Sequence, residues 1–181
     1  MLINKYWYLF PFLIKSLIPI RTEKALNVSS YLGLWNQVAT SRSTKLFGTG
    51  ISFNNVTAKY GFLSDSNISV YNSGLNQKNN FTNIFGYSYI KGKNNCKRKL
   101  HFDGVPYDGN YWIVKLGPII NNQYQYAIIS GALTNFFGTR FSLYVLARNR
   151  KDYFLKYEKE VQKWCLENNF KFFWNKYVIT Y

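Results

Sequence analysis

Histidine and cysteine are scarce in this chain, and their scarcity excludes most of the chemistry that enzymes and metal sites use. His101 is the only histidine, and Cys96 and Cys165 are the only cysteines. The cysteine spacing fits neither a CxxC motif nor a zinc site. The chain also lacks a GxSxG elbow, an HExxH pair and a phosphate-binding loop. We therefore expect no catalytic residue, no metal and no cofactor, and we expect His101 to be a surface residue of a strand.

The two cysteines leave two alternatives open. If the protein is secreted, Cys96 and Cys165 can form one disulfide between a lysine-rich strand and the C-terminal helix. Otherwise both are buried free thiols.

Acidic residues are few. The chain has 8 Asp and Glu against 23 Lys and Arg, which gives a net charge of +15. Such a field favours anionic partners, among them membrane surfaces, nucleic acid and ligands with a carboxylate. The positive charges are scattered, however, and no zinc-finger, helix-turn-helix or RNA-reading motif accompanies them. We therefore do not favour nucleic-acid binding, and an anionic membrane surface remains a candidate partner.

Long apolar runs are missing except near the N terminus. Residues 1–20 combine Lys5 with an apolar run over residues 6–14, which is too short to span a bilayer. This pattern predicts a cleaved secretory signal, with an uncleaved N-terminal anchor as the alternative. Residues 21–181 then form a single domain, secreted to the medium, a periplasm or the lumen of a vacuole, including a parasitophorous vacuole. No cysteine lies in the leader, so we do not expect lipid attachment there.

Aromatic residues are abundant, at 20% of the chain. Many of them lie in short stretches bounded by Gly, Asn, Asp or Pro, which predict β-strands separated by turns. Residues 41–52 predict a long loop, residues 150–168 have helical spacing of their apolar positions, and residues 170–181 predict a last strand or an extended tail. The eight predicted strands cover residues 31–40, 54–64, 67–73, 83–91, 97–103, 110–117, 123–131 and 140–148.

Two motifs far apart in the chain indicate how these strands are arranged. Gly33 and Trp35 lie in the first predicted strand, and Arg148 ends the last one. A guanidinium stacks on an indole face through cation–π attraction. Trp35 and Arg148 can meet only if the first and last strands are neighbours, as they are in a closed barrel.

Six stretches, in this order along the chain, carry a family resemblance. They are residues 31–35, 56–60, 68–72, 109–114, 124–129 and 144–148. Together they resemble the lipocalin family and are most similar to its bacterial lipocalin and apolipoprotein D branch. The resemblance implies an all-β fold: an eight-stranded antiparallel up-and-down β-barrel, or calyx, with one C-terminal α-helix and a short final strand. A barrel of eight strands has room for one small ligand.

Alternate residues of a barrel strand face inward. Trp35 and Arg148 define the inward face of the first and last strands, and the resemblance defines it elsewhere. We expect Gly33, Trp35 and Arg148 to close the barrel rather than to touch a ligand. The predicted ligand-binding residues are Tyr31, Gln37, Ala58, Tyr60, Val70, Asn72, Tyr111, Ile113, Tyr144 and Leu146.

An aromatic interior with isolated polar groups suits an apolar ligand with one polar end. The favoured hypothesis is therefore a non-enzymatic carrier or scavenger of a small hydrophobic molecule, such as a fatty acid, a lysophospholipid, another lipid, a sterol or haem or another tetrapyrrole. The alternative is a membrane-associated structural or interaction protein that acts through its basic surface in membrane organisation or lipid homeostasis. A homo-oligomer is compatible with either hypothesis.

Overall fold

The computed structural model describes residues 20–47, 53–64, 66–135, 138–168, 170–173 and 175–180. The leader lies outside these residues except for Ile20. The helices are α2 (Val28–Tyr31), α3 (Arg42–Phe47), α4 (Arg150–Asp152), the π-helical turn η1 (Tyr153–Tyr157) and α5 (Glu158–Glu167). The strands are β1 (Gly33–Ser41), β2 (Asn54–Phe62), β3 (Asn67–Leu75), β4 (Phe81–Ile90), β5 (Lys97–Phe102), β6 (Gly109–Leu116), β7 (Ile119–Ile120), β8 (Gln123–Tyr124), β9 (Tyr126–Asn135), β10 (Gly138–Ala147) and β11 (Tyr177–Ile179).

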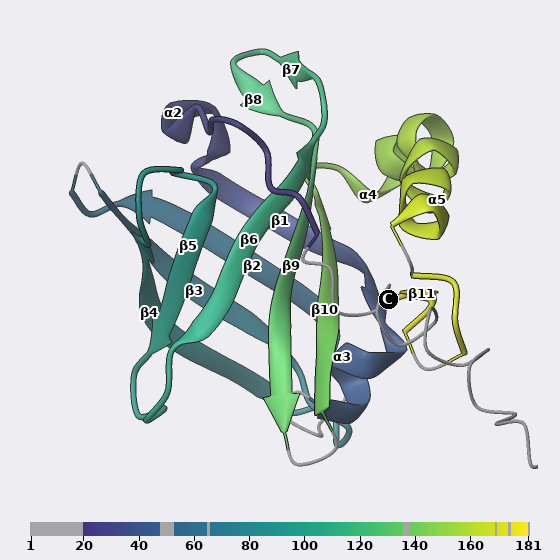
Figure 1. The fold of residues 1–181 in the computed structure, drawn as a ribbon, viewed down its shortest axis with the longest axis horizontal. Coiled ribbons are helices and arrows are strands. Elements are labelled where there is room, and N and C mark those ends of the chain that lie inside the picture. Colours follow the sequence, from purple (N-terminus) through teal and green to yellow (C-terminus); the bar gives the residue numbers. More distant parts are fainter. Residues whose placement is uncertain are drawn as a thin grey trace, which may run out of the picture.

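The main sheet closes on itself. Its strands follow the order β10-β9-β6-β5-β4-β3-β2-β1, and a further antiparallel pairing joins β10 to β1 (Figure 1). The short strand β11 adds to the end of β1 outside the barrel, opposite Ala39–Ser41. The predicted fold class, an eight-stranded up-and-down barrel with a C-terminal helix and a short final strand, is confirmed.

The barrel wall separates two apolar clusters. The inner cluster lies inside the barrel and is built around Trp35, Tyr60, Val70 and Ile113. The outer cluster includes Val145 and alternating residues of β6, β9 and β10, and it packs under the C-terminal helix. The alternation along each strand assigns its side chains to one cluster or the other.

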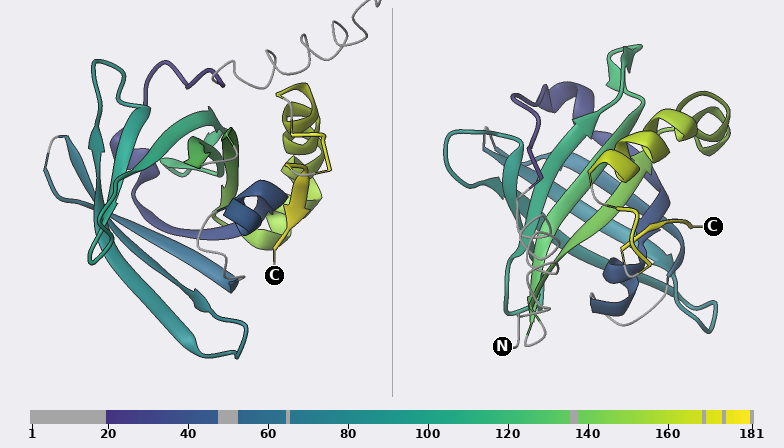
Figure 2. Two further views of the ribbon diagram at one scale, coloured as in Figure 1. Left: turned by 60° about the horizontal axis from the view of Figure 1, so that its bottom comes forward. Right: turned by 45° about the vertical axis from the view of Figure 1, so that its right-hand side comes forward.

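The C-terminal helix covers the outer wall at β9 and β10 (Figure 2). Val161 and Cys165 are buried there, as their helical spacing predicts. The π-helical turn, closed by a hydrogen bond from the Glu158 amide to the Tyr153 carbonyl, also buries Tyr153. The Tyr126 hydroxyl donates to Glu160 at 2.9 Å and so ties β9 to the helix.

The predicted strands differ from the observed ones by a few residues at their ends, and two of the differences have a clear physical cause. The first begins at Gly33, not at residue 31, because Asn27 caps α2 by accepting a hydrogen bond from the Ser30 amide. The strand predicted over 123–131 is divided, because residues 123–124 pair with β7 in a separate hairpin. Asn121 and Asn122 form its turn with φ of 50° and 60°, a left-handed conformation that asparagine tolerates. The predicted loop over 41–52 contains α3, and residues 48–52 lie outside the described residues.

One end of the barrel is closed by Trp35 and Arg148. The Arg148 guanidinium lies 3.8 Å from the centre of the Trp35 ring, so the predicted contact is confirmed. Its nitrogens donate to backbone carbonyls of Leu32 at 2.7 Å and Leu34 at 2.8 Å, and also to those of Ser30, Tyr31 and Tyr124. The guanidinium thereby satisfies carbonyls at the end of α2 that the helix itself leaves unpaired.

Gly33 is required beside this cation. Its φ is +101°, and a Cβ at this position would lie 3.2 Å from Arg148 Nη1. A larger residue would therefore be strained in its backbone and would displace the guanidinium. The contact between Arg148 and Trp35 therefore needs a glycine at position 33 as well as the indole at position 35.

We predict that Arg148→Lys lowers the free energy of unfolding by about 3 kcal/mol, because an ammonium cannot replace the planar set of donors or the stacked contact. Arg150→Lys is the matched control, since among the described residues Arg150 donates to one carbonyl only, that of Thr180, at 3.2 Å. Urea unfolding of the two variants measures the difference. Equal losses of unfolding free energy in the two variants would show that Arg148 has no special role in closing the barrel.

Candidate functional site

The inner cluster brings together most of the side chains that the sequence predicts to face a ligand. Gln37 and Asn72 are half-buried at inward-facing strand positions, where Gln37 pairs with Leu146 and Asn72 with Ala58. Tyr144 packs against the inner cluster without being fully buried. Seven predicted residues are members of the inner cluster itself: Tyr31, Ala58, Tyr60, Val70, Tyr111, Ile113 and Leu146.

Three tyrosines form a hydrogen-bonded group at the closed end of the interior. The Tyr111 hydroxyl donates to the Tyr60 hydroxyl at 2.8 Å, and the Tyr31 hydroxyl bonds to that of Tyr111. The rings of Tyr31 and Tyr60 are stacked with centroids 5.2 Å apart. Burial raises the pKa of Tyr60 to about 12 and raises the pKa values of Tyr31 and Tyr111 well above their ordinary value. The three hydroxyls are therefore neutral hydrogen-bonding groups.

Farther from the closed end, the interior contains polar groups without partners. Asn72 Oδ1 is buried and accepts no hydrogen bond from any described residue. The Tyr144 hydroxyl and the Gln37 side-chain amide also form no hydrogen bond with any residue that the structure describes. Burial raises the Tyr144 pKa, so its hydroxyl is neutral too. A filled protein core normally pairs a buried acceptor such as Asn72 Oδ1.

Several inward-facing positions away from Trp35 keep solvent-accessible surface. On β3, Ile68 and Val70 are buried, whereas Asn72 is half-buried. On β5, Arg98 is buried, whereas Leu100 and Phe102 are only partly buried although they pack on the inner cluster. The partial exposure of Asn72, Leu100 and Phe102 shows that the interior is accessible at these positions, whereas Trp35 is fully buried.

Arg98, which is 1% exposed, was not among the predicted interior residues. Its Nε donates to Ser88 Oγ at 2.7 Å, and Nη2 donates to the carbonyls of Ser66 and Ser88. Nη1 donates to the Asn95 carbonyl at 3.3 Å. These bonds hold the loops at the closed end and use most of the guanidinium donors. The alternation of Arg98, Leu100 and Phe102 with Lys97, Lys99 and His101 was the signal for this inward position.

The disulfide considered for Cys96 and Cys165 does not form, and the free-thiol alternative is correct. Both cysteines are free and buried. Cys96 belongs to the inner cluster and Cys165 to the outer one, so the barrel wall lies between them. Burial raises the pKa of the Cys96 thiol to about 11 and that of Cys165 to about 12, so both are protonated near neutral pH.

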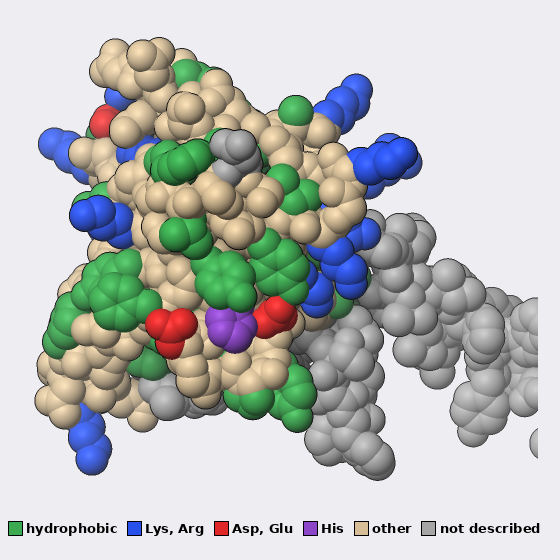
Figure 3. Space-filling view, turned by 90° about the vertical axis from the view of Figure 1, so that its left-hand side faces the viewer, with side chains coloured by type: hydrophobic (Ala, Val, Ile, Leu, Met, Phe, Trp, Pro, Cys, Tyr) green, Lys and Arg blue, Asp and Glu red, His purple; other side chains and the backbone are tan. Residues whose placement is uncertain are grey.

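His101 faces away from the interior, as predicted. Its Nδ1 lies 2.9 Å from Asp108 Oδ1, and the Tyr89 hydroxyl donates to the other oxygen of that carboxylate at 2.6 Å. Tyr87 lies against the imidazole at a centroid distance of 5.1 Å. Figure 3 shows this outer face, where hydrophobic and acidic side chains surround the histidine. Among the described residues, no group of three or more His, Cys, Asp or Glu could hold a metal ion.

Comparison with known proteins identifies relatives of this arrangement. The profile of the lipocalin-like domain family matches residues 26–163. The chain is 31% identical over 143 residues to the outer membrane lipoprotein Blc of Vibrio cholerae serotype O1, a match that covers 78% of this chain and 79% of that protein. Over the residues that the structure describes, no helix has the length and hydrophobicity needed to cross a bilayer.

Solved structures share the fold at low sequence identity. Lobster apocrustacyanin A1 has a TM-score of 0.64 and 16% identity, and the match covers 90% of this chain and 92% of that one. The cockroach allergen Per a 4 has a TM-score of 0.59 and 16% identity, with coverage of 92% and 96%. At this level of identity the likeness concerns the barrel alone.

The buried tyrosines predict a loss of stability in alkali. A group whose pKa is raised in the folded state contributes stability fully below its unfolded pKa, and this contribution is lost as the pH rises through the folded pKa. For Tyr60 the window runs from about 10 to about 12. We expect Tyr60→Phe to reduce the steepness of this loss by up to about 1.4 kcal/mol per pH unit. Urea unfolding at several pH values between about 10 and about 12 measures this slope.

Tyr107→Phe is the control, because Tyr107 is 82% exposed. This variant should keep the pH dependence of the native protein. Identical slopes for Tyr60→Phe and the native protein would contradict the assignment of Tyr60 as a buried neutral hydroxyl.

Proposed function

This chain belongs to the lipocalin family, and on that premise we propose that it carries or scavenges a small hydrophobic ligand in the barrel interior. The observation that supports this function best is the partial exposure of inward-facing side chains beyond a sealed, aromatic end. A binding role needs a lined interior with access, whereas catalysis needs a positioned acid, base or nucleophile. The only histidine faces the outside of the barrel, which favours a non-enzymatic role.

The proposed ligand is a lipid with an acyl chain. Ala58, Val70 and Leu146 offer it apolar contact next to the aromatic rings. Burial of each methylene contributes about 0.8 kcal/mol, so a chain of moderate length binds without an ionic contact. A fatty acid or a lysophospholipid is our first choice within this class.

A polar atom of the ligand would meet the unpaired groups of the interior. Asn72, Gln37 and Tyr144 are neutral, and the buried cation Arg98 already donates to Ser88 and to backbone carbonyls. A neutral hydroxyl, ester or carbonyl therefore suits the interior better than a carboxylate does. We place an ionised headgroup, where the ligand has one, at the open end in water.

We propose that the protein acts outside the cytoplasm. The composition of residues 1–20 supports this location, and the relative in Vibrio cholerae is by name an outer membrane lipoprotein. A carrier in such a compartment meets membranes when it loads and unloads lipid.

Filling the interior tests the proposal. Ala58 faces inward and is 5% exposed, whereas its neighbour Lys59 is exposed on the outside of the same strand. We expect Ala58→Phe to weaken binding of a fluorescent fatty acid at least tenfold, because the ring would occupy acyl-chain volume. Lys59→Phe should leave the affinity within about twofold, since a change on the outer wall does not alter the cavity. Displacement titration and mass spectrometry of copurified lipid provide the readouts.

Thermal unfolding of Ala58→Phe must accompany the titration, because overpacking can cost about 1–3 kcal/mol. Equal affinities for a folded Ala58→Phe variant and the native protein would overturn interior binding. The absence of any bound or displaceable lipid in the native protein would overturn it as well.

Asn72→Leu tests the polar contact separately. The substitution removes a buried acceptor that has no partner, so we expect the ligand-free protein to gain about 1 kcal/mol of unfolding free energy. The affinity for a lipid whose polar atom contacts Asn72 should fall about fivefold, which corresponds to one lost hydrogen bond. A gain in unfolding free energy together with a loss of affinity would identify Asn72 as a ligand contact, whereas loss of a structural contact would lower the unfolding free energy.

Asn83→Leu is the control for this change, since Asn83 is exposed on β4. It should alter neither quantity by more than about 0.5 kcal/mol, as expected for a surface substitution. A loss of both stability and affinity in Asn72→Leu would refute the proposed contact.

A further inference from the structure

A second pocket lies on the outside of the barrel. It has a volume of about 440 Å³ and lies between the segment 20–24 and the wall at β5 and β6. Its lining residues are Ile20, Arg21, Thr22, Lys24, Lys97 and Trp112. Ile20 and Trp112 pack against the outer cluster, not the inner one, so the barrel wall separates this pocket from the interior. We call it the outer groove.

The segment that forms one side of the outer groove is anchored to the barrel. The Glu23 amide donates to the Ile113 carbonyl at 2.9 Å, and Asn94 Nδ2 donates to the Glu23 carbonyl at 2.9 Å and to Thr22 Oγ1 at 3.1 Å. These bonds fix the positions from which Arg21 and Lys24 extend. The groove is thus formed by an ordered backbone, whereas a flexible tail would present no fixed site.

The outer groove concentrates positive charge. Three of its six lining residues are Arg21, Lys24 and Lys97, and none of them forms an ion pair with any described residue. Glu23, the acid of this segment, does not line the groove, and its carboxylate accepts the Leu116 amide at 3.2 Å. Three unpaired cations around one pocket create a local field that attracts an anion.

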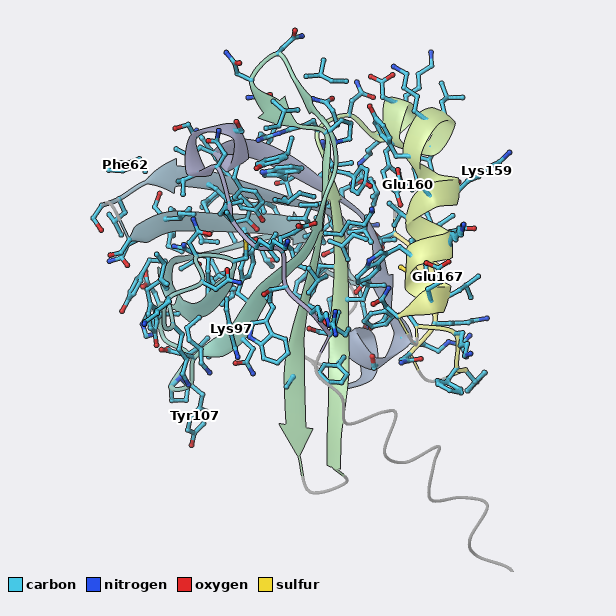
Figure 4. The ribbon with its side chains drawn as sticks, turned by 45° about the horizontal axis from the view of Figure 1, so that its top comes forward. Phe62, Lys97, Tyr107, Lys159, Glu160 and Glu167 are labelled. Carbon is cyan, nitrogen blue, oxygen red and sulfur yellow. The ribbon has the colours of Figure 1, made fainter. Side chains whose placement is uncertain are left out.

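The floor of the outer groove is apolar and aromatic. The Lys97 ammonium lies 5.7 Å from the centre of the Trp112 ring, which in turn packs against Phe141 at 6.3 Å. An indole beside lysine and arginine is the combination that favours the boundary between headgroups and acyl chains of a bilayer. Figure 4 shows Lys97 beside the N-terminal segment and Lys159 on the distant helix α5.

We propose that the outer groove binds the phosphate of an anionic lipid headgroup. Arg21, Lys24 and Lys97 would contact the phosphate oxygens, and Trp112 and Ile20 would contact the adjoining glycerol and the first methylenes. Free phosphate carries the same anionic oxygens, so the experiment distinguishes free phosphate from the phosphate of a lipid headgroup.

The experiment compares two triple variants of the full chain that carry the same net charge. The groove variant is Arg21→Gln, Lys24→Gln and Lys97→Gln. The control variant is Lys151→Gln, Lys159→Gln and Lys163→Gln, which removes three exposed cations of α4 and α5 that form no ion pair with any described residue. Binding to phosphatidylcholine vesicles with and without phosphatidylglycerol is measured by sedimentation at about 0.15 M salt, where fields decay within about 8 Å. Near-ultraviolet circular dichroism checks that both variants are folded.

We expect the groove variant to lose about a hundredfold in affinity for the anionic vesicles, because each Lys or Arg at such a surface contributes roughly fivefold. The control variant should lose less than about threefold. Release of the native protein by inorganic phosphate at constant ionic strength would support recognition of the phosphate itself. If the groove variant alone loses affinity for the vesicles and inorganic phosphate does not release the native protein, the result would support recognition of the phosphate as part of a lipid. Equal losses in both variants, or native binding by the groove variant, would overturn the proposal.

Discussion

The stack of Arg148 on Trp35 is the contact on which the barrel depends. It joins the last strand to the first, and its guanidinium also binds carbonyls at the end of α2. Burial lowers the pKa of Arg148 to about 10, so the cation is held at a desolvation cost that its carbonyl partners and the indole offset. Removing this one side chain would leave both an unsatisfied helix end and an unsealed barrel end.

Closure by Trp35 and Arg148 gives the interior one sealed, aromatic end, and polar side chains that keep some solvent exposure lie beyond it. The sealed end holds a group of tyrosine hydroxyls that bond to one another, and beyond it lies the buried Asn72 Oδ1, which has no partner among the residues that the structure describes. Protein stability alone would favour apolar replacements at such positions. Under the proposed function, a ligand supplies the missing partners.

The barrel wall also keeps two surfaces of opposite character apart. The inner surface is aromatic and neutral near the proposed ligand, while the outer groove carries unpaired cations over an indole. A lipid carrier has use for both, since it must hold an apolar chain away from water and approach anionic membranes to exchange it. The two proposals rest on different residues and can fail independently.

The family resemblance set the inward phase of the strands that contain Tyr60, Val70 and Ile113, and strict alternation of side chains along a strand then placed these three residues inside. The same rule applied to β5 would have placed Arg98 inside, but a lysine-rich stretch concealed it. The division of residues 119–131 into a hairpin and a strand was missed, since it depends on the left-handed conformations of Asn121 and Asn122. Predicted contacts to a ligand remain predictions.

The sequence by itself indicated the closed barrel. Short strands and turn residues are local signals, the Trp35–Arg148 pair requires the first and last strands to be neighbours, and the six family stretches occur in the order of a lipocalin barrel. Only the tertiary structure decided which polar groups lack partners, that Cys96 and Cys165 lie on opposite sides of the wall, and that Arg21, Lys24 and Lys97 share one groove. Those facts concern distances between residues far apart in the chain, and such distances arise only when the whole sheet closes and its packing is complete.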